Sequence, residues 1–166
     1  MSPAFNLLRT PNRLENQSQL NPSRKERTMK HVYNDGGRAA AGYKGTANDC
    51  GVRAAAIATG KSYRQIYKRI NEISKSEKTK QKSNARTGIY RKTLDTLMSE
   101  EGFEWISCMS IGSGCNVHMR RDELPTGKLV VRLSKHYAAV VNGECHDTYD
   151  CTRNGTRCVY GYWIKN

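Results

Sequence analysis

Apolar residues in the first half of the chain recur at the spacing of helices. Residues 49–59 are apolar almost all round, which predicts a buried helix that ends at Gly60. A second helix is predicted to begin at Ser62, because Gln65 three residues later completes a capping box. A third helical pattern covers residues 90–101. The apolar stripe of the second helix consists of Tyr63, Ile66, Tyr67, Ile70 and Ile73.

After residue 102 the pattern changes to short runs that are typical of strands. Asn142-Gly143 separates two of these runs and is a strong signal for a two-residue hairpin turn. Helices followed by strands predict an α+β fold, in which N-terminal helices pack on a C-terminal antiparallel sheet. The expected strands lie within residues 103–109, 128–134, 136–142, 144–150 and 157–164.

The first 28 residues have a different character from the rest of the chain. Residues 1–28 are polar and aperiodic, which predicts a disordered tail, or an extension before an alternative start at Met29. Residues 29–166 are expected to form one domain. The chain contains no long apolar run and no secretory signal pattern, so we expect a cytoplasmic protein without membrane contact.

Positive charge is concentrated in one segment. The formal net charge is +13, and residues 61–92 carry eleven Lys or Arg against two Glu. Such a segment would favour nucleic acid through phosphate contacts. The alternative is a solvated helix face followed by a mobile loop. The lysines at the centre of this basic segment are Lys75, Lys78, Lys80 and Lys82.

Cys50 is expected in the first turn of the first long helix. Unpaired backbone N–H groups and the helix dipole favour a thiolate there, and the same groups could bind an oxyanion. The carboxylate of Asp49 would act against this, because a like charge raises the pKa of a thiol. The alternative is a buried structural cysteine, which is a common residue in protein cores.

The Asn142-Gly143 turn places a histidine and an acid on one face of the predicted hairpin. With this turn, Val141 faces Glu144, and Asp147 becomes the diagonal neighbour of His136 on the same face. Asp150 points to the opposite face. A thiol nucleophile needs such a pair, since the histidine exchanges the thiol proton and the acid orients the imidazole. We therefore predict a catalytic triad of Cys50, His136 and Asp147.

The segments NDCGVRAAAIATG and LSKHYAAVVNGECHDTYD resemble the papain-like cysteine peptidase superfamily. The likeness extends over residues 46–163 and is closest to small papain-like proteins of tailed bacteriophages. It implies a nucleophile helix packed on an antiparallel sheet, with roles for Cys50, His136 and Asp147, in an infected bacterial host. Many relatives carry an oxyanion-binding Gln about six residues before the cysteine, where this chain has Lys44. Asn48 or Thr46 could substitute, together with the Cys50 N–H.

The other cysteines give only a weak metal signal. No CxxC pair is present among the six cysteines, so we expect neither a metal nor another cofactor. An Asn154-Gly155 hairpin would place Cys151 opposite Cys158, and in a reducing cytosol both are expected as thiols.

Two functions compete at this point. The first is a cysteine hydrolase that cleaves a peptide or isopeptide bond in a peptide or protein substrate, or a related acyltransferase that passes the acyl group to an amine. The second is a non-catalytic papain-like protein whose basic segment binds nucleic acid or an acidic host protein. Neither hypothesis defines an oligomeric state.

Overall fold

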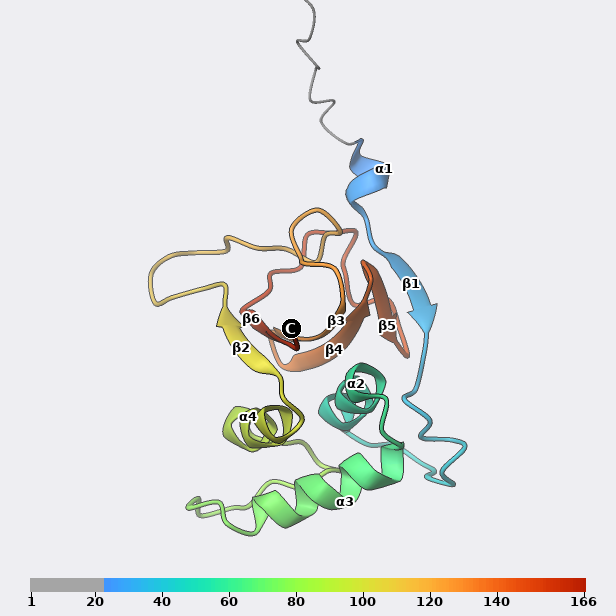
Figure 1. The fold of residues 1–166 in the computed structure, drawn as a ribbon, viewed down its shortest axis with the longest axis vertical. Helices are drawn as coiled ribbons and strands as arrows, with labels where there is room; N and C mark the ends of the chain where they lie inside the picture. Colours follow the sequence, from blue (N-terminus) through green and yellow to red (C-terminus); the bar gives the residue numbers. More distant parts are fainter. Residues whose placement is uncertain (1–22) are drawn as a thin grey trace, which may run out of the picture.

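Four helices and six strands make up the described part of the chain, residues 23–166, in a computed structural model (Figure 1). One sheet contains all six strands in the order β1-β5-β4-β3-β6-β2. The helices are α1 (Arg24–Arg27), α2 (Cys50–Thr59), α3 (Tyr63–Ser74) and α4 (Arg91–Glu100). The strands are β1 (Lys30–Tyr33), β2 (Glu104–Ser107), β3 (Lys128–Leu133), β4 (His136–Val141), β5 (Glu144–Asp147) and β6 (Gly161–Ile164).

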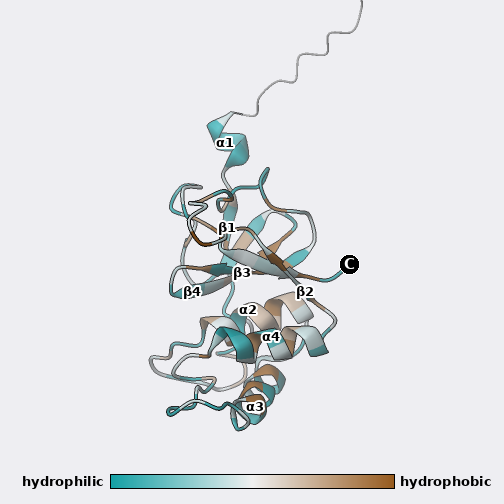
Figure 2. Ribbon diagram, turned by 90° about the vertical axis from the view of Figure 1, so that its left-hand side faces the viewer, coloured by the Kyte–Doolittle hydropathy of each residue, from teal (hydrophilic) through white to brown (hydrophobic). Residues whose placement is uncertain are grey.

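Helices α2, α3 and α4 lie together on one side of the sheet, and α2 is the helix that packs directly on β4 (Figure 1). Val130, Ala139 and Trp163 face this helical layer and share a buried cluster with it. Their strand neighbours Leu129 and Val140 belong to a second cluster on the other side of the sheet. Both faces of the central strands are therefore buried. Figure 2 shows the strands on one side of the layer formed by α2, α3 and α4.

The three predicted long helices are confirmed, with small shifts at their ends. The capping box between Ser62 and Gln65 is present at the start of α3. Gly60 ends α2 with φ 73°, a left-handed conformation that glycine adopts at little cost. The predicted α+β class is confirmed as well. No helix of the described residues is long and apolar enough to cross a membrane.

Two features at the start of the described chain differ from the expectation. Strand β1 pairs in parallel with β5, so the sheet is mixed rather than wholly antiparallel. Residues 23–28 are not a free tail, because α1 carries a capping box and the Arg27 carbonyl accepts a bond from the Arg121 N–H. Residues 1–22 lie outside the described residues. No periodic pattern marks a four-residue strand, so β1 could not be recognised from the sequence alone.

The predicted hairpin at Asn142-Gly143 is confirmed, whereas the prediction of a hairpin at Asn154-Gly155 is wrong. Val141 pairs with Glu144, as the first turn requires. In the second segment, Arg153, Asn154 and Gly155 all have positive φ and form a wider turn without a strand ladder. Cys158 lies opposite His118 instead.

This change of partner also changes the state of two cysteines. Cys115 and Cys158 form a disulfide, so the expectation of a thiol is wrong for Cys158, whereas it is confirmed for Cys151, which is free. The segment that carries Cys115 runs beside Cys158, because the Val159 N–H donates to the Val117 carbonyl and the Met119 N–H to the Arg157 carbonyl.

Candidate active site

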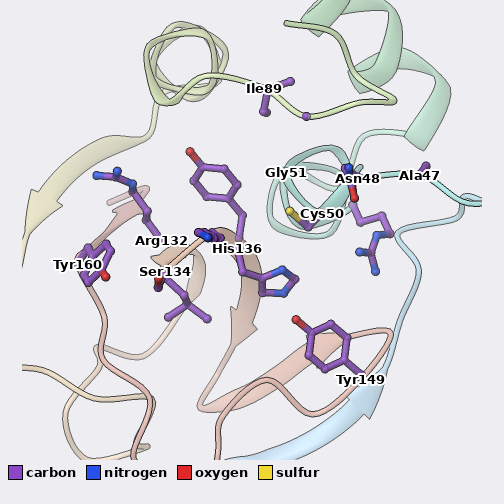
Figure 3. Close-up of a pocket in the computed structure, with 15 residues that line it drawn as sticks. Ala47, Asn48, Cys50, Gly51, Ile89, Arg132, Ser134, His136, Tyr149 and Tyr160 are labelled. Carbon is purple, nitrogen blue, oxygen red and sulfur yellow. The ribbon is translucent and has the colours of Figure 1, made fainter.

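Cys50 is the first residue of α2 and lines a cleft with a volume of about 800 Å³. The cleft lies between the start of α2, the segment that carries Ile89, and the turn from β3 to β4 (Figure 3). His136 is the first residue of β4 and lines the same cleft. Two residues that are 86 positions apart in sequence thus reach one site.

The start of α2 is left open toward this cleft. Asp49 occupies the N-cap position, but its side chain forms no capping hydrogen bond. Its buried carboxylate instead accepts a bond from the Tyr63 hydroxyl at 2.6 Å and pairs with Arg38 and Arg53 at 2.9 and 3.1 Å. The first-turn N–H groups of α2 therefore remain available to a ligand. The paired arginines also counter the negative charge that we expected to act against a Cys50 thiolate.

His136 is held by a buried acid. Its Nε2 lies 2.5 Å from Oδ2 of Asp147, and both side chains are buried. The other oxygen of Asp147 accepts bonds from the Thr148 N–H at 2.7 Å and from Arg53 Nη1 at 3.1 Å. Because Nε2 is engaged, Nδ1 is the ring nitrogen left for proton exchange with a thiol. The predicted diagonal between His136 and Asp147 is thereby confirmed.

The electrostatics of the site favour an ion pair between Cys50 and His136. Burial by itself raises the pKa of the Cys50 thiol, but the hydrogen bond and charge of His136, the Tyr137 N–H and Arg53 together lower it. Burial by itself lowers the pKa of His136, yet its bonds to Asp147, Cys151 and Cys50 raise the pKa to about 11. The lowered pKa of Cys50 and the raised pKa of His136 both favour a thiolate beside an imidazolium.

The pKa of Asp147 moves in the direction that supports this pair. Burial raises the pKa of the carboxyl group, but the hydrogen bond and charge of His136, the Thr148 N–H and Arg53 outweigh it and lower the pKa. Asp147 is therefore ionised near neutral pH and stabilises the imidazolium.

Two further cysteines lie behind the histidine. The sulfur atoms of Cys145 and Cys151 are 3.6 Å apart, and both residues are buried. The contact with Cys145 and burial raise the pKa of Cys151, which keeps this thiol protonated. His136, Asp147 and Cys151 offer three ligand atoms within 4.8 Å, a set that a metal ion could use. Because Asp147 already binds His136 and Arg53, we assign no metal to this group.

Of the two oxyanion candidates, the structure brings one to the cleft. Asn48 is exposed and lines the cleft beside Cys50 (Figure 3). Its backbone N–H donates to the Arg86 carbonyl at 2.8 Å, which positions the residue. Thr46 is not among the residues that line the cleft, and its carbonyl accepts a bond from Arg86 Nη2.

Sequence reasoning missed Arg53, which connects the two acids of the site. Its Nε lies 3.1 Å from Asp49, and its Nη1 lies 3.1 Å from Asp147. A signal for it was present, since Arg53 is the one charged residue within the apolar segment 50–59. A charge on a buried helix requires a buried partner.

The basic segment lies apart from this site. Lys75, Lys78, Lys80 and Lys82 are exposed, and none of them lines the cleft. None forms an ion pair within 4 Å of an acid among the described residues, although the charge of Lys82 contributes to lowering the pKa of Glu77 and its Nζ donates to the Lys75 carbonyl. Elsewhere in the segment the charge is partly compensated, for example by the bonds from Arg69 to Glu72 and Glu100.

Comparisons with protein-family models, curated proteins and solved structures found no match to this chain. The functional assignment therefore depends on the geometry and chemistry of the cleft.

Proposed function

We propose that this protein is a papain-like cysteine hydrolase that cleaves a peptide or isopeptide bond. The observation that carries the proposal is that Cys50 and His136 line one open cleft, with His136 bound to the buried Asp147. Cys50, His136 and Asp147 would act as nucleophile, base and orienting acid. Thiol catalysis needs these three roles, because a base-activated sulfur attacks a carbonyl carbon.

The reaction would proceed through an acyl-enzyme. The Cys50 thiolate attacks the carbonyl carbon, and the electron pair of the C=O bond moves to its oxygen. The Cys50 N–H and the Asn48 side chain would stabilise this oxyanion. As the tetrahedral intermediate collapses, the C–N bond breaks and the His136 imidazolium protonates the leaving amine. Water then attacks the thioester carbonyl carbon and gives one proton to His136. The C–S bond breaks, which releases the carboxylic acid product and regenerates the Cys50 thiolate.

The relationship to phage proteins and the cytoplasmic location belong to the same proposal. The resemblance of the segments around Cys50 and His136 supports a phage papain-like protein. The disulfide between Cys115 and Cys158 provides a test of this location, because such bonds are rare in the cytosol. Recovery of both cysteines as free thiols from bacterial cytoplasm would agree with the proposed location, and recovery of an intact disulfide would contradict it.

Iodoacetamide labelling at graded pH tests the ion pair directly. We expect Cys50 to react at pH 6.5, because its lowered pKa keeps the thiolate populated where an ordinary thiol is about 1% ionised. His136→Ala should slow this labelling more than tenfold at pH 6.5 and much less at pH 9. Peptide mass spectrometry after a short pulse measures the rate at each cysteine.

Cys151 provides an internal control in the same experiment. Its raised pKa and its burial should leave it unlabelled while Cys50 reacts. Equal rates at Cys50 in the wild type and in His136→Ala across the whole pH range would contradict the proposed ion pair.

A second function is favoured by the four exposed lysines without ion pairs. Nucleic acid or an acidic host protein could bind this surface independently of the cleft. Replacing Lys75, Lys78, Lys80 and Lys82 by Gln should then weaken binding to single- or double-stranded DNA at low salt by more than tenfold and flatten its salt dependence. Fluorescence anisotropy across a salt series measures this, and unchanged binding by the fourfold variant would exclude the segment.

A further inference from the structure

The side of the cleft beyond His136 has an unbalanced charge. Four of the residues that line the cleft can carry a positive charge, namely Arg53, Arg132, Lys135 and His136, and no Asp or Glu of residues 23–166 lines it. Arg53 is paired with Asp49 and Asp147, and His136 is paired with Asp147. The two cleft cations without an acidic partner among the described residues are Arg132 and Lys135.

Arg132 is held in place but not neutralised. It lies on β3, in register with Tyr137 of β4 and Gly161 of β6. Its guanidinium lies 5.7 Å from the centre of the Tyr160 ring, within the range of a cation–π contact. Tyr160 also lines the cleft, and its N–H donates to the Arg132 carbonyl at 2.9 Å. Figure 3 shows Arg132 and Tyr160 together, on the opposite side of the cleft from Asn48.

Lys135 adds a second cation at the rim. It lies in the two-residue turn between Leu133 and His136, and its φ is 54°. Residues other than Gly, Asn and Asp seldom adopt this left-handed conformation with positive φ. Within residues 23–166, neither Arg132 nor Lys135 forms an ion pair. The turn thus presents a positive charge to solvent beside the catalytic histidine, at some cost in backbone strain.

We infer that this cleft selects substrates with a carboxylate side chain, Glu or Asp, close to the scissile bond and on the side of Arg132 and Lys135. This inference rests on the proposed hydrolase function and names its substrate class. A guanidinium binds a carboxylate through two parallel hydrogen bonds, and the partial shelter of the cleft strengthens each of them. The carboxylate would supply the negative partner that residues 23–166 do not provide.

Hexapeptide sub-libraries test this selectivity. In each, one position is Glu, Asp, Gln or Asn, and the other positions are randomised. We expect cleavage with Glu or Asp at one position to be about tenfold faster than with the matching amide, and the ratio to shrink at higher salt. Arg132→Gln should bring the ratio close to one, and Arg132→Lys should retain part of it. Lys128→Gln, at the other end of the same strand, is the matched control and should keep the full ratio.

Binding separates this inference from the proposed chemistry. Cys50→Ala protein is mixed with equal amounts of the Glu and Gln sub-libraries, and the retained peptides are quantified by mass spectrometry. Preferential retention of Glu peptides that is lost on Arg132→Gln supports acid recognition even where cleavage is absent, in which case the hydrolase proposal alone fails. Equal cleavage and equal retention of acids and amides, or a preference that survives in the Arg132→Gln, Lys135→Gln double variant, would overturn the inference.

Discussion

Cys50→Ala is expected to abolish peptide cleavage, and His136→Ala is expected to lower kcat by about a thousandfold or more. The first change removes the sulfur that forms the acyl-enzyme. The second removes both the partner that lowers the pKa of Cys50 and the acid that protonates the leaving amine. The loss is measured with the best peptide from the sub-libraries, by mass spectrometry of the two products.

Two variants control for changes that do not touch the proposed chemistry. Cys108→Ala removes a cysteine outside the cleft, where burial raises the thiol pKa. His146→Gln changes a histidine on the neighbouring strand that binds Asn34 rather than the cleft residues. Both should retain nearly full activity. Cleavage by Cys50→Ala at more than about one hundredth of the wild-type rate would mean that another group is the nucleophile.

Asp147→Asn should lower kcat/KM by more than tenfold, whereas Asp150→Asn should have little effect. A neutral amide cannot stabilise the imidazolium, so the pKa of His136 should fall and that of Cys50 should rise. The pH at which iodoacetamide labels Cys50 should therefore shift upward, a change that a merely structural defect would not produce. Asp150 binds the N–H and hydroxyl of Thr152 in the following loop and does not reach His136.

The stability of the same variants has a defined pH dependence. The pKa of Asp147 is lowered in the folded state, so its ionisation stabilises the fold above its ordinary pKa of about 3.9. This contribution is lost as the pH falls through the lowered value. The gap in free energy of unfolding between wild type and Asp147→Asn should thus be largest near neutral pH and shrink in acid. A greater loss of activity in Asp150→Asn than in Asp147→Asn would show that the acid of the triad is misassigned.

Local signals in the sequence were sufficient for most of the secondary structure. The Ser62–Gln65 capping box, the Gly60 stop and the Asn142-Gly143 turn each act within a few residues, and each is present in the structure. The turn also determined the hairpin register, because strand alternation leaves one way to place His136 and Asp147 on a common face. Two of the three residues of the predicted triad, His136 and Asp147, were placed by this single turn.

Long-range pairing is where sequence reasoning failed. The parallel pairing of β1 with β5 joins residues more than 100 positions apart, and no local pattern in β1 indicates it. The Asn154-Gly155 signal was misleading for a similar reason. The stretch before Cys158 pairs with the segment at His118, and this tertiary contact outweighed the local preference for a hairpin.

The sequence by itself determined the residue types of the proposed triad, the helix start that carries Cys50 and the strand register that joins His136 to Asp147. These are decided by interactions between near neighbours, which a pattern of a few residues encodes. Only the tertiary structure decided that Cys50 and His136 line one cleft, that Arg53 links Asp49 with Asp147, and that Arg132 lines the same cleft. These contacts depend on how α2 packs against the sheet, and that packing is the sum of many weak apolar contacts that no short motif records.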